Sequence, residues 1–204
     1  MNWEKILDKV QRIAHPFTVF TLGRICYQKN PKLFNAVAES LPDIRFLWIG
    51  DGELRDELKS PNIEITGWVD REKALSLSMN ADVFILTSLW EGLPISLLEA
   101  MYMEKLCVVS DVIGNNDVIE NGKNGFVCRN VEEFVKAIPS SSTEIKKHAY
   151  EDIMHTYNIF EMRNKYQTIY DASLKSNYSN KNRLIEFDMG GINEDNLHSG
   201  SRNI

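Results

Sequence analysis

Short apolar runs recur along the chain and alternate with stretches whose apolar residues follow a helical period. Runs typical of buried strands lie at residues 17–22, 44–49, 63–66, 83–87, 106–110 and 126–128. Helices are predicted over residues 31–40, 53–59, 71–79, 95–103, 131–138, 144–155 and 158–174. This alternation predicts an α/β fold, a Rossmann-like, mostly parallel sheet of about six strands with helices on both faces.

The same pattern divides the chain into three parts. Residues 1–16 are expected to be a helical lead-in or interdomain segment, because apolar side chains share one helical face, namely Trp3, Ile6, Leu7, Val10 and Ile13. Residues 17–175 carry the alternating strands and helices and form the predicted domain. Residues 176–204 are rich in Asn, Ser and Gly, and we expect them to be a disordered tail.

Composition and charge exclude several function classes. A hydrophobic fraction of 43% allows a real core, whereas a net charge of −6 argues against a nucleic-acid partner, which needs clustered Lys and Arg. No apolar run approaches the ~18 to 20 residues of a membrane span, and no signal peptide is recognisable, so a cytoplasmic location is expected. Three widely spaced cysteines without a C-x-x-C pair indicate neither disulfides nor a zinc site.

The stretch TSLWEGLPISLLEA, residues 87–100, carries the strongest candidate chemistry. It places Glu91 and Glu99 eight positions apart, around a tight bend at a predicted helix start. Pro94 suits the first helical position, and Gly92 allows a ligand to approach the backbone closely. A helix start favours an anion, and the Glu99 carboxylate can accept bonds from hydroxyl groups beside it. An anion next to a diol describes a nucleotide.

Three candidate residues follow directly on predicted strand ends. These are Arg24, Gly67 and Glu91, which should therefore share the edge of the sheet where ligands of such folds bind. The loop after the first strand carries two cations, Arg24 and Lys29, which could bind a phosphate or could be an ordinary solvated loop.

Five short segments give the chain a family resemblance. In order, they are GRICYQK (23–29), GDGEL (50–54), ITGWV (65–69), SLWEGLPISLLEAM (88–101) and NGKNGFV (121–127). Together they resemble the C-terminal, donor-binding domain of retaining glycosyltransferases with the GT-B fold, in the group 1 class (family four). The resemblance covers residues 17–175 and implies that the predicted sheet is one half of a GT-B fold.

The resemblance also implies a set of site residues. Arg24 and Lys29 correspond to the basic pair that neutralises the donor diphosphate, without a metal or cofactor. Glu99 corresponds to the glutamate on the ribose hydroxyls, and Glu91 to the one near the donor sugar. Arg24, Lys29 and Glu91 are thus the expected catalytic set. Further main-chain contacts are implied with the base at Val69 and with the sugar and phosphates at Gly92, Leu93, Pro94 and Ile95.

The chain departs from the family pattern at three points. Asn30 stands where a Gly usually follows the lysine, although Asn tolerates unusual backbone angles. A family segment Gly-Gly-x-Pro-Glu is replaced by residues 113–117, IGNND. The family's acceptor-binding domain is absent, so an acceptor domain in cis or in trans is an expected partner and the chain alone should be weak or inactive. Any peripheral membrane association, at the inner face of the membrane, would come through that missing domain.

The function predicted is therefore the donor-binding domain of a glycosyltransferase. It would bind a UDP- or GDP-sugar for retaining transfer to an alcohol acceptor, in polysaccharide or glycolipid biosynthesis. Two alternatives stay open: a non-catalytic nucleotide-sugar-binding module or partner subunit of a split enzyme, and a fragment of a GT-B nucleotide-sugar epimerase. At residue level, Glu91 could cap the helix start, a salt bridge could explain Glu99, and Trp48, Trp68 and Trp90 are expected to be packing residues.

Overall fold

The six predicted strands form one sheet in a computed structural model of the chain, which describes residues 15–140 and 142–189. They are β1 (Thr18–Leu22), β2 (Arg45–Ile49), β3 (Ile63–Ile65), β4 (Val83–Leu86), β5 (Leu106–Ser110) and β6 (Phe126–Cys128). The strand order is β3-β2-β1-β4-β5-β6, and every neighbouring pair is parallel. The predicted Rossmann-like α/β fold is confirmed.

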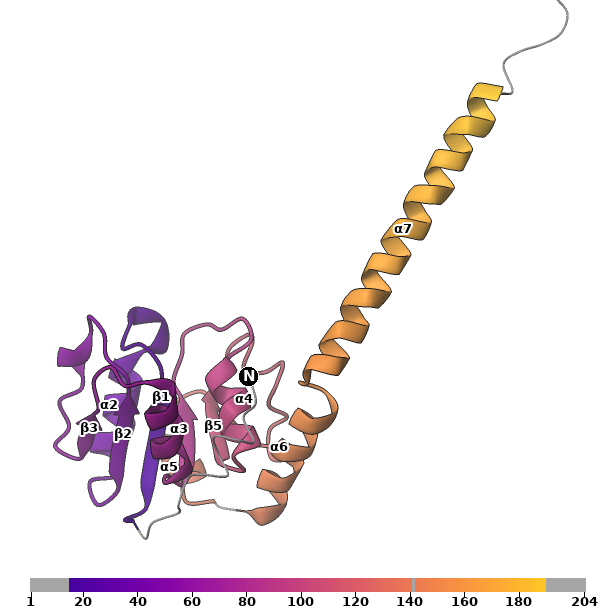
Figure 1. The fold of residues 1–204 in the computed structure, drawn as a ribbon. Helices are drawn as coiled ribbons and strands as arrows, with labels where there is room; N and C mark the ends of the chain where they lie inside the picture. Colours follow the sequence, from indigo (N-terminus) through magenta and orange to yellow (C-terminus); the bar gives the residue numbers. More distant parts are fainter. Residues whose placement is uncertain (1–14, 141, 190–204) are drawn as a thin grey trace, which may run out of the picture. The chain divides into compact units, whose positions relative to one another are not determined.

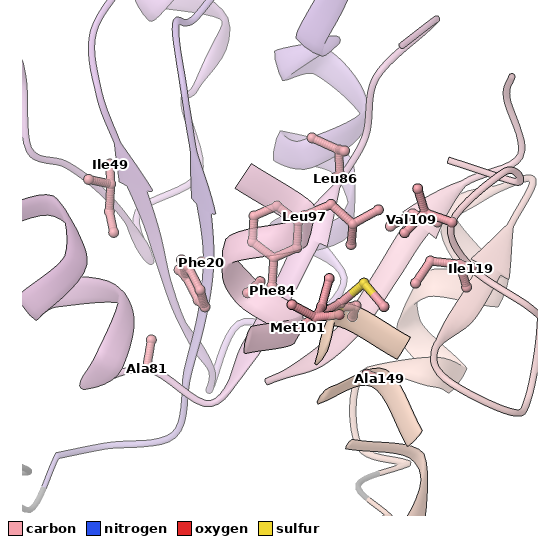
Figure 2. Close-up of a cluster of buried hydrophobic side chains, with 14 of the residues drawn as sticks. Phe20, Ile49, Ala81, Phe84, Leu86, Leu97, Met101, Val109, Ile119 and Ala149 are labelled. Carbon is pink, nitrogen blue, oxygen red and sulfur yellow. The ribbon is translucent and has the colours of Figure 1, made fainter. Parts of the chain in front are cut away.

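Helices cover both faces of this sheet (Figure 1). They are α2 (Pro31–Glu39), α3 (Arg71–Met79), α4 (Ile95–Tyr102), α5 (Val131–Ala137) and α6 (Thr143–His155). Residues of α3, α4 and α6 pack on one face and residues of α2 and α5 on the other, because side chains of a strand alternate between its two sides. In β4, Phe84 belongs to the first cluster, shown in Figure 2, and Ile85 to the second.

The direction of chain winding reverses between β1 and β4. The chain first runs outward through β1, β2 and β3, and then returns to place β4 on the other side of β1. In open parallel sheets, this reversal leaves a crevice beyond the carboxyl ends of the two central strands. The loops at residues 23–30 and 87–94 leave those ends, so the fold brings the two candidate stretches together.

One predicted helix is replaced by a shorter turn in the structure, and one begins later than expected. The segment at residues 53–59 contains only a 3-10 turn, η2 (Arg55–Glu57), because the amide groups of Lys59 and Ser60 turn away to donate to Asn35 Oδ1 at 2.7 and 2.8 Å. Pro94 is the N-cap of α4 and not its first helical residue, so the helix begins at Ile95, one position after the position predicted for Pro94.

The chain separates into two compact units, residues 1–157 and 158–204. In the second, α7 (Ile159–Met189) begins where a helix was predicted but continues past Leu174, since the segment holds no Gly or Pro before Gly190. The tail expected from residue 176 thus begins inside a helix, and residues 190–204, like the lead-in at 1–14, lie outside the described residues. None of the helices described has the length and hydropathy of a membrane span.

Candidate functional site

The centre of the candidate site is an ion pair between Lys29 and Glu91. Lys29 ends the 3-10 turn η1 (Tyr27–Lys29) after β1, and Glu91 lies in the loop after β4. Their Nζ and Oε1 atoms are 2.6 Å apart, with the lysine side chain 17% exposed and the glutamate side chain 7% exposed. The two strand ends at the reversal point are therefore joined by a largely buried pair of opposite charges.

Hydroxyl and amide groups fix the Glu91 carboxylate further. Ser88 Oγ donates to Glu91 Oε1 at 2.5 Å, and Gln28 Nε2 contacts Oε2 at 3.4 Å. Ser110, at the end of β5, donates from Oγ to the Ser88 carbonyl at 2.5 Å, and Asn115 Nδ2 donates to the Ser110 carbonyl at 3.0 Å. A polar chain thus leads from the end of β5 to the glutamate. The sequence interpretation did not identify these positioning groups.

Backbone contacts hold the two loops against each other. The Leu89 amide donates to the Gln28 carbonyl at 2.8 Å, and Gln28 Nε2 donates to the Trp90 carbonyl at 2.9 Å. Thr87 Oγ1 donates to the Lys29 carbonyl at 2.8 Å. Because these bonds engage main-chain atoms on both sides, the spacing of Lys29 and Glu91 is set by the loops as well as by their charges.

Asn30 fits the position where the family usually has glycine. Its backbone is left-handed, with φ 50° and ψ 63°, a conformation that Asn adopts more readily than most residues. Its side-chain oxygen also accepts from the Leu33 amide at 3.4 Å and so caps α2. The expectation that Asn30 preserves the turn of this loop is confirmed.

The start of α4 offers backbone donors to a ligand. Its N-cap residue, Pro94, makes no side-chain cap bond, and the Glu91 carboxylate does not cap the helix either. The capping interpretation of Glu91 is therefore wrong, because its oxygens are used by Lys29, Ser88 and Gln28. Gly92, Leu93 and Ile95 are exposed around this helix start, where the dipole favours an anion.

Glu99 lies one turn further along α4 and is buried, with 1% of its surface exposed. Arg71 Nη2 donates to its Oε1, so a salt bridge does exist at this position. Burial raises the pKa of the Glu99 carboxyl, and the hydrogen bond and positive charge of Arg71 oppose that rise. Sequence reasoning missed Arg71, although it lies two positions after Val69, the expected base contact.

Arg24 does not join Lys29 at the centre. Its side chain is 64% exposed, and its Nε lies 3.0 Å from Glu53 Oε2. The GDGEL segment that carries Glu53 is pressed onto the same loop, since a Cβ on Gly50 would lie 2.1 Å from the Gly23 carbonyl oxygen. The expected basic pair is thus divided between two carboxylates.

Of the three tryptophans expected to be packing residues, one lies in the core and two are exposed. Trp48 packs in the core and donates from Nε1 to the Gly23 carbonyl at 2.9 Å. Trp68 and Trp90 are 77% and 51% exposed, so neither lies in the core as Trp48 does, although the Trp90 ring contacts that of Tyr27. Val69, beside Trp68, is partly buried against the cluster that includes α3 and α4.

The segment that replaces the family's Gly-Gly-x-Pro-Glu lies directly against Glu91. The Glu91 amide donates to the Ile113 carbonyl at 3.2 Å. Gly114 has φ +87°, and a Cβ there would lie 2.5 Å from the Glu91 carbonyl oxygen and 2.4 Å from that of Gly92. A side chain at this position would displace the loop that carries the glutamate.

The buried thiols and acidic residues give no sign of another centre. Cys107 and Cys128 are buried in β5 and β6, as expected, and Cys26 is partly buried. Among residues 15–140 and 142–189, no group of three or more His, Cys, Asp or Glu side chains is arranged to hold a metal ion.

Most of the chain matches one family of known proteins. Residues 16–141 match the family described as glycosyl transferases group 1. The chain is 29% identical over 193 residues to the UDP-Gal:alpha-D-GlcNAc-diphosphoundecaprenol alpha-1,3-galactosyltransferase of Escherichia coli, covering 83% of this chain and 49% of the relative. It is 28% identical to an N,N'-diacetylbacillosaminyl-diphospho-undecaprenol alpha-1,3-N-acetylgalactosaminyltransferase of Campylobacter jejuni, covering 78% and 45%. The chain thus spans about half the length of these curated relatives.

Solved structures show the same fold. The C-terminal domain of the group 1 glycosyl transferase LpcC from Francisella tularensis superposes with a TM-score of 0.61 at 19% identity, covering 78% of this chain and 94% of that domain. Anabaena Alr3699/HepE, solved with UDP-glucose, gives a TM-score of 0.68 at 18% identity, covering 78% of this chain and 50% of that one. The family match covers residues 16–141, and the parallel sheet has the fold of the LpcC domain. The chain therefore belongs to the glycosyl transferases group 1 family.

Proposed function

We propose that this chain is the donor-binding domain of a retaining glycosyltransferase that uses a nucleotide-diphosphate sugar. The observation that carries the proposal is the Lys29–Glu91 pair at the reversal point of the sheet, beside a helix start whose N-cap makes no side-chain bond. A lysine and free backbone donors suit a diphosphate, and a carboxylate beside them suits the hydroxyls of a sugar.

The diphosphate is assigned to the cationic side of this site. Lys29 supplies a charged donor, and the amide groups at the start of α4, near Gly92 to Ile95, supply further donors and a positive dipole end. Arg24 reaches the same edge of the sheet from the loop after β1. These groups stabilise negative charge that develops on the leaving nucleotide when the glycosidic bond breaks.

The nucleoside is assigned to the neighbouring end of the site. Glu99 accepts hydrogen bonds from the ribose hydroxyls, since an ionised carboxylate is an acceptor only and matches a diol. The main chain at Val69 contacts the base. UDP- and GDP-sugars are the donor candidates, and a UDP-sugar is favoured by the relatives whose names or structures carry UDP.

Transfer to an acceptor needs a part beyond these residues. The chain spans about half of its relatives, and in our proposal the other half supplies the acceptor-binding domain, in cis or in trans. A structure named as a GtfA/B complex, with a TM-score of 0.65 to this chain, is a precedent for assembly from two chains. Glu91 then contacts the donor sugar while the acceptor alcohol attacks with retention.

The acceptor class follows from the names of the relatives. The Escherichia coli and Campylobacter jejuni relatives are named for acceptors linked to undecaprenol through a diphosphate. We therefore assign the enzyme to polysaccharide or glycolipid assembly. Such an acceptor lies at a membrane surface, so we place the whole enzyme at the cytoplasmic face of a membrane, attached through its acceptor-binding part.

Calorimetry tests the donor assignment directly. UDP, GDP, and the matching nucleosides are titrated into the wild-type chain and into Lys29→Met and Glu99→Gln. One diphosphate should bind, Lys29→Met should weaken the diphosphate but leave the nucleoside unchanged, and Glu99→Gln should weaken both. Lys123→Met is the matched control, because Lys123 pairs with an exposed Glu120 through a 2.5 Å contact on a different loop. Absence of binding to every nucleotide overturns the proposal.

Product analysis separates transfer from the alternatives. The chain is combined with an acceptor-binding half and supplied with a UDP-sugar and an alcohol acceptor. A glycoside with the anomeric configuration of the donor supports the proposal. Release of an epimerised sugar or its nucleotide would indicate the epimerase alternative, and binding without any reaction would indicate a non-catalytic module.

A further inference from the structure

Arg71 and Glu99 form a second ion pair at the same end of the sheet, and this pair is highly asymmetric in exposure. The glutamate side chain is 1% exposed and the arginine side chain 39%. Arg71 is the first residue of α3, and Glu99 lies in α4. Arg71 is therefore the member of the pair that solvent reaches.

The position of Arg71 is fixed by its own helix. Asp70 caps α3, because its Oδ1 accepts from the Lys73 amide at 2.8 Å. One turn later, Ala74 packs in the same hydrophobic cluster as Ala100 of α4, which adjoins Glu99 in sequence. Both helices are thus anchored in one hydrophobic cluster, and the Arg71–Glu99 hydrogen bond joins them.

A buried carboxylate without a cation would not stay ionised. Burial disfavours the charged form, and the hydrogen bond and charge of Arg71 oppose that effect at Glu99. On the strands packed against α4, β4 carries no ionisable side chain and β5 carries only Cys107, whose pKa is itself raised by burial. Helix α6 packs against α4 through Tyr150, which contacts Tyr102, and its charged side chains, Glu144, Lys146, Lys147, His148, Glu151, Asp152 and His155, are not among the causes of the Glu99 pKa shift. Arg71 is the charged group that acts on the Glu99 pKa.

We propose that Arg71 is the positioning residue for Glu99, holding its carboxylate ionised and oriented to accept the ribose hydroxyls of the donor nucleotide. This inference rests on the proposed donor function, because it concerns the residue assigned there to the ribose. It adds a selectivity: above the Glu99 pKa, which Arg71 lowers, the site distinguishes a ribonucleotide from its 2′-deoxy counterpart.

The experiment measures ribose selectivity against pH. The dissociation constants of UDP and 2′-deoxy-UDP, or of the guanine pair if GDP is the ligand, are determined between pH 5 and pH 8.5. Their ratio reports the hydroxyl contact alone, because protonation of the phosphates affects both nucleotides equally. The variants are Arg71→Met, which removes the charge, and Arg71→Lys, which keeps it.

A matched control exists at the opposite edge of the sheet. Arg45 begins β2 and pairs with Glu64 through a 2.5 Å contact, and its side chain is 35% exposed, close to the value for Arg71. Arg45→Met therefore removes the same charge from a similarly exposed arginine away from the site, whose partner Glu64 is 57% exposed where Glu99 is buried. Its ratio of dissociation constants should follow the wild type at every pH.

The outcomes are distinct. Wild type should prefer the ribonucleotide, and its preference should fade as pH drops through the Glu99 pKa. In Arg71→Met the midpoint of that loss should move upward by about one to three pH units, with a smaller movement in Arg71→Lys.

A variant profile equal to wild type overturns the role of Arg71 alone. If wild type binds UDP and 2′-deoxy-UDP equally well, the assignment of Glu99 to the ribose is overturned. If wild type binds neither nucleotide, the proposed function itself is overturned. If Arg71→Met does not fold, Arg71→Lys decides.

Discussion

Lys29 Nζ lies 2.6 Å from Glu91 Oε1, in a pair that joins the ends of the two central strands of the sheet. The glutamate that belongs to the expected sugar site therefore also neutralises the lysine that belongs to the expected phosphate site. In the proposed function, a donor diphosphate competes with Glu91 for this lysine. We therefore expect the affinity for a diphosphate to depend on both residues of the pair.

Replacing each member of this pair should change UDP affinity in opposite directions. Lys29→Met removes a charge-assisted bond to the phosphates and should weaken UDP about 10- to 100-fold. Glu91→Gln removes a competing negative charge and should strengthen UDP binding about three- to tenfold, since UDP carries no donor sugar that could lose a contact with Glu91. Calorimetry at fixed ionic strength measures both. Weaker UDP binding in Glu91→Gln would contradict the competition.

Asn30 should tolerate only one kind of replacement. Asn30→Gly keeps the left-handed backbone and loses only the cap on α2, whereas Asn30→Ala loses the cap and pays for the positive φ. We expect the free energy of unfolding to fall by less than about 1 kcal/mol for Gly and by about 2 kcal/mol for Ala. Urea unfolding followed by circular dichroism gives both values. Equal stability of the two variants would show that the φ angle is not limiting.

The hydrophobic pattern along the chain was sufficient to predict the strands of the sheet, but it did not predict the conformation of short segments between them. Strands such as residues 83–86 are buried on both faces, so an uninterrupted apolar run identifies them without knowledge of their neighbours. The segment at 53–59 has helix-forming residues, but the Asn35 side chain takes the amide groups that a helix would need. That contact spans 24 positions and cannot be recognised in a local window.

The residues of the candidate site likewise include some that the sequence predicts and some that it does not. Glu91 and Glu99 were identified because their spacing and the helix start lie in one continuous stretch. Arg71 and Ser110 were missed because they act on that stretch from a different helix and a different strand. The separation of Arg24 from Lys29 was missed for the same reason, since it depends on Glu53 in the next loop.

Gly114 should be intolerant of any side chain. A Cβ there would lie 2.4 Å from the Gly92 carbonyl oxygen at φ +87°, so Gly114→Ala should displace the loop of Glu91 and destabilise the protein by about 1–3 kcal/mol. Gly92→Ala is the matched comparison, because its Cβ would meet nothing within 4 Å, and it should change stability by less than about 1 kcal/mol. Thermal unfolding of both variants measures the contrast, and similar losses would argue against a steric cause.

The three cysteines should differ in reactivity. Burial and the nearby Glu133 raise the pKa of the Cys128 thiol to about 12, and burial raises the pKa of Cys107 as well, so neither forms the thiolate that alkylating reagents attack. Cys26 is partly buried and should react first. Mass spectrometry after brief treatment with iodoacetamide at pH 8 should show one modification on the native protein and three in denaturant. Rapid modification of Cys128 in the native protein would contradict its burial.

Glu99 should make the protein less stable as pH rises. Its folded-state pKa is raised, so between the unfolded pKa, near the ordinary value for a glutamate, and the higher folded value, the native state binds more protons than the unfolded state. The contribution of Glu99 to stability is fully present below the unfolded pKa and is lost as pH rises through the folded pKa. Glu99→Gln lacks this titration, and Arg71 stays charged throughout, so the loss of its carboxylate partner is a constant offset.

The measurement is therefore the stability of Glu99→Gln minus that of wild type, obtained from urea unfolding at several pH values between 4 and 8. This difference should increase with pH. Glu133→Gln provides a control of opposite sign, because bonds from the Arg129 amide and guanidinium lower the Glu133 pKa, and its contribution is lost as pH falls. Its difference from wild type should decrease with pH. A flat profile for Glu99→Gln beside a falling one for Glu133→Gln would show that Arg71 cancels the burial of Glu99 completely.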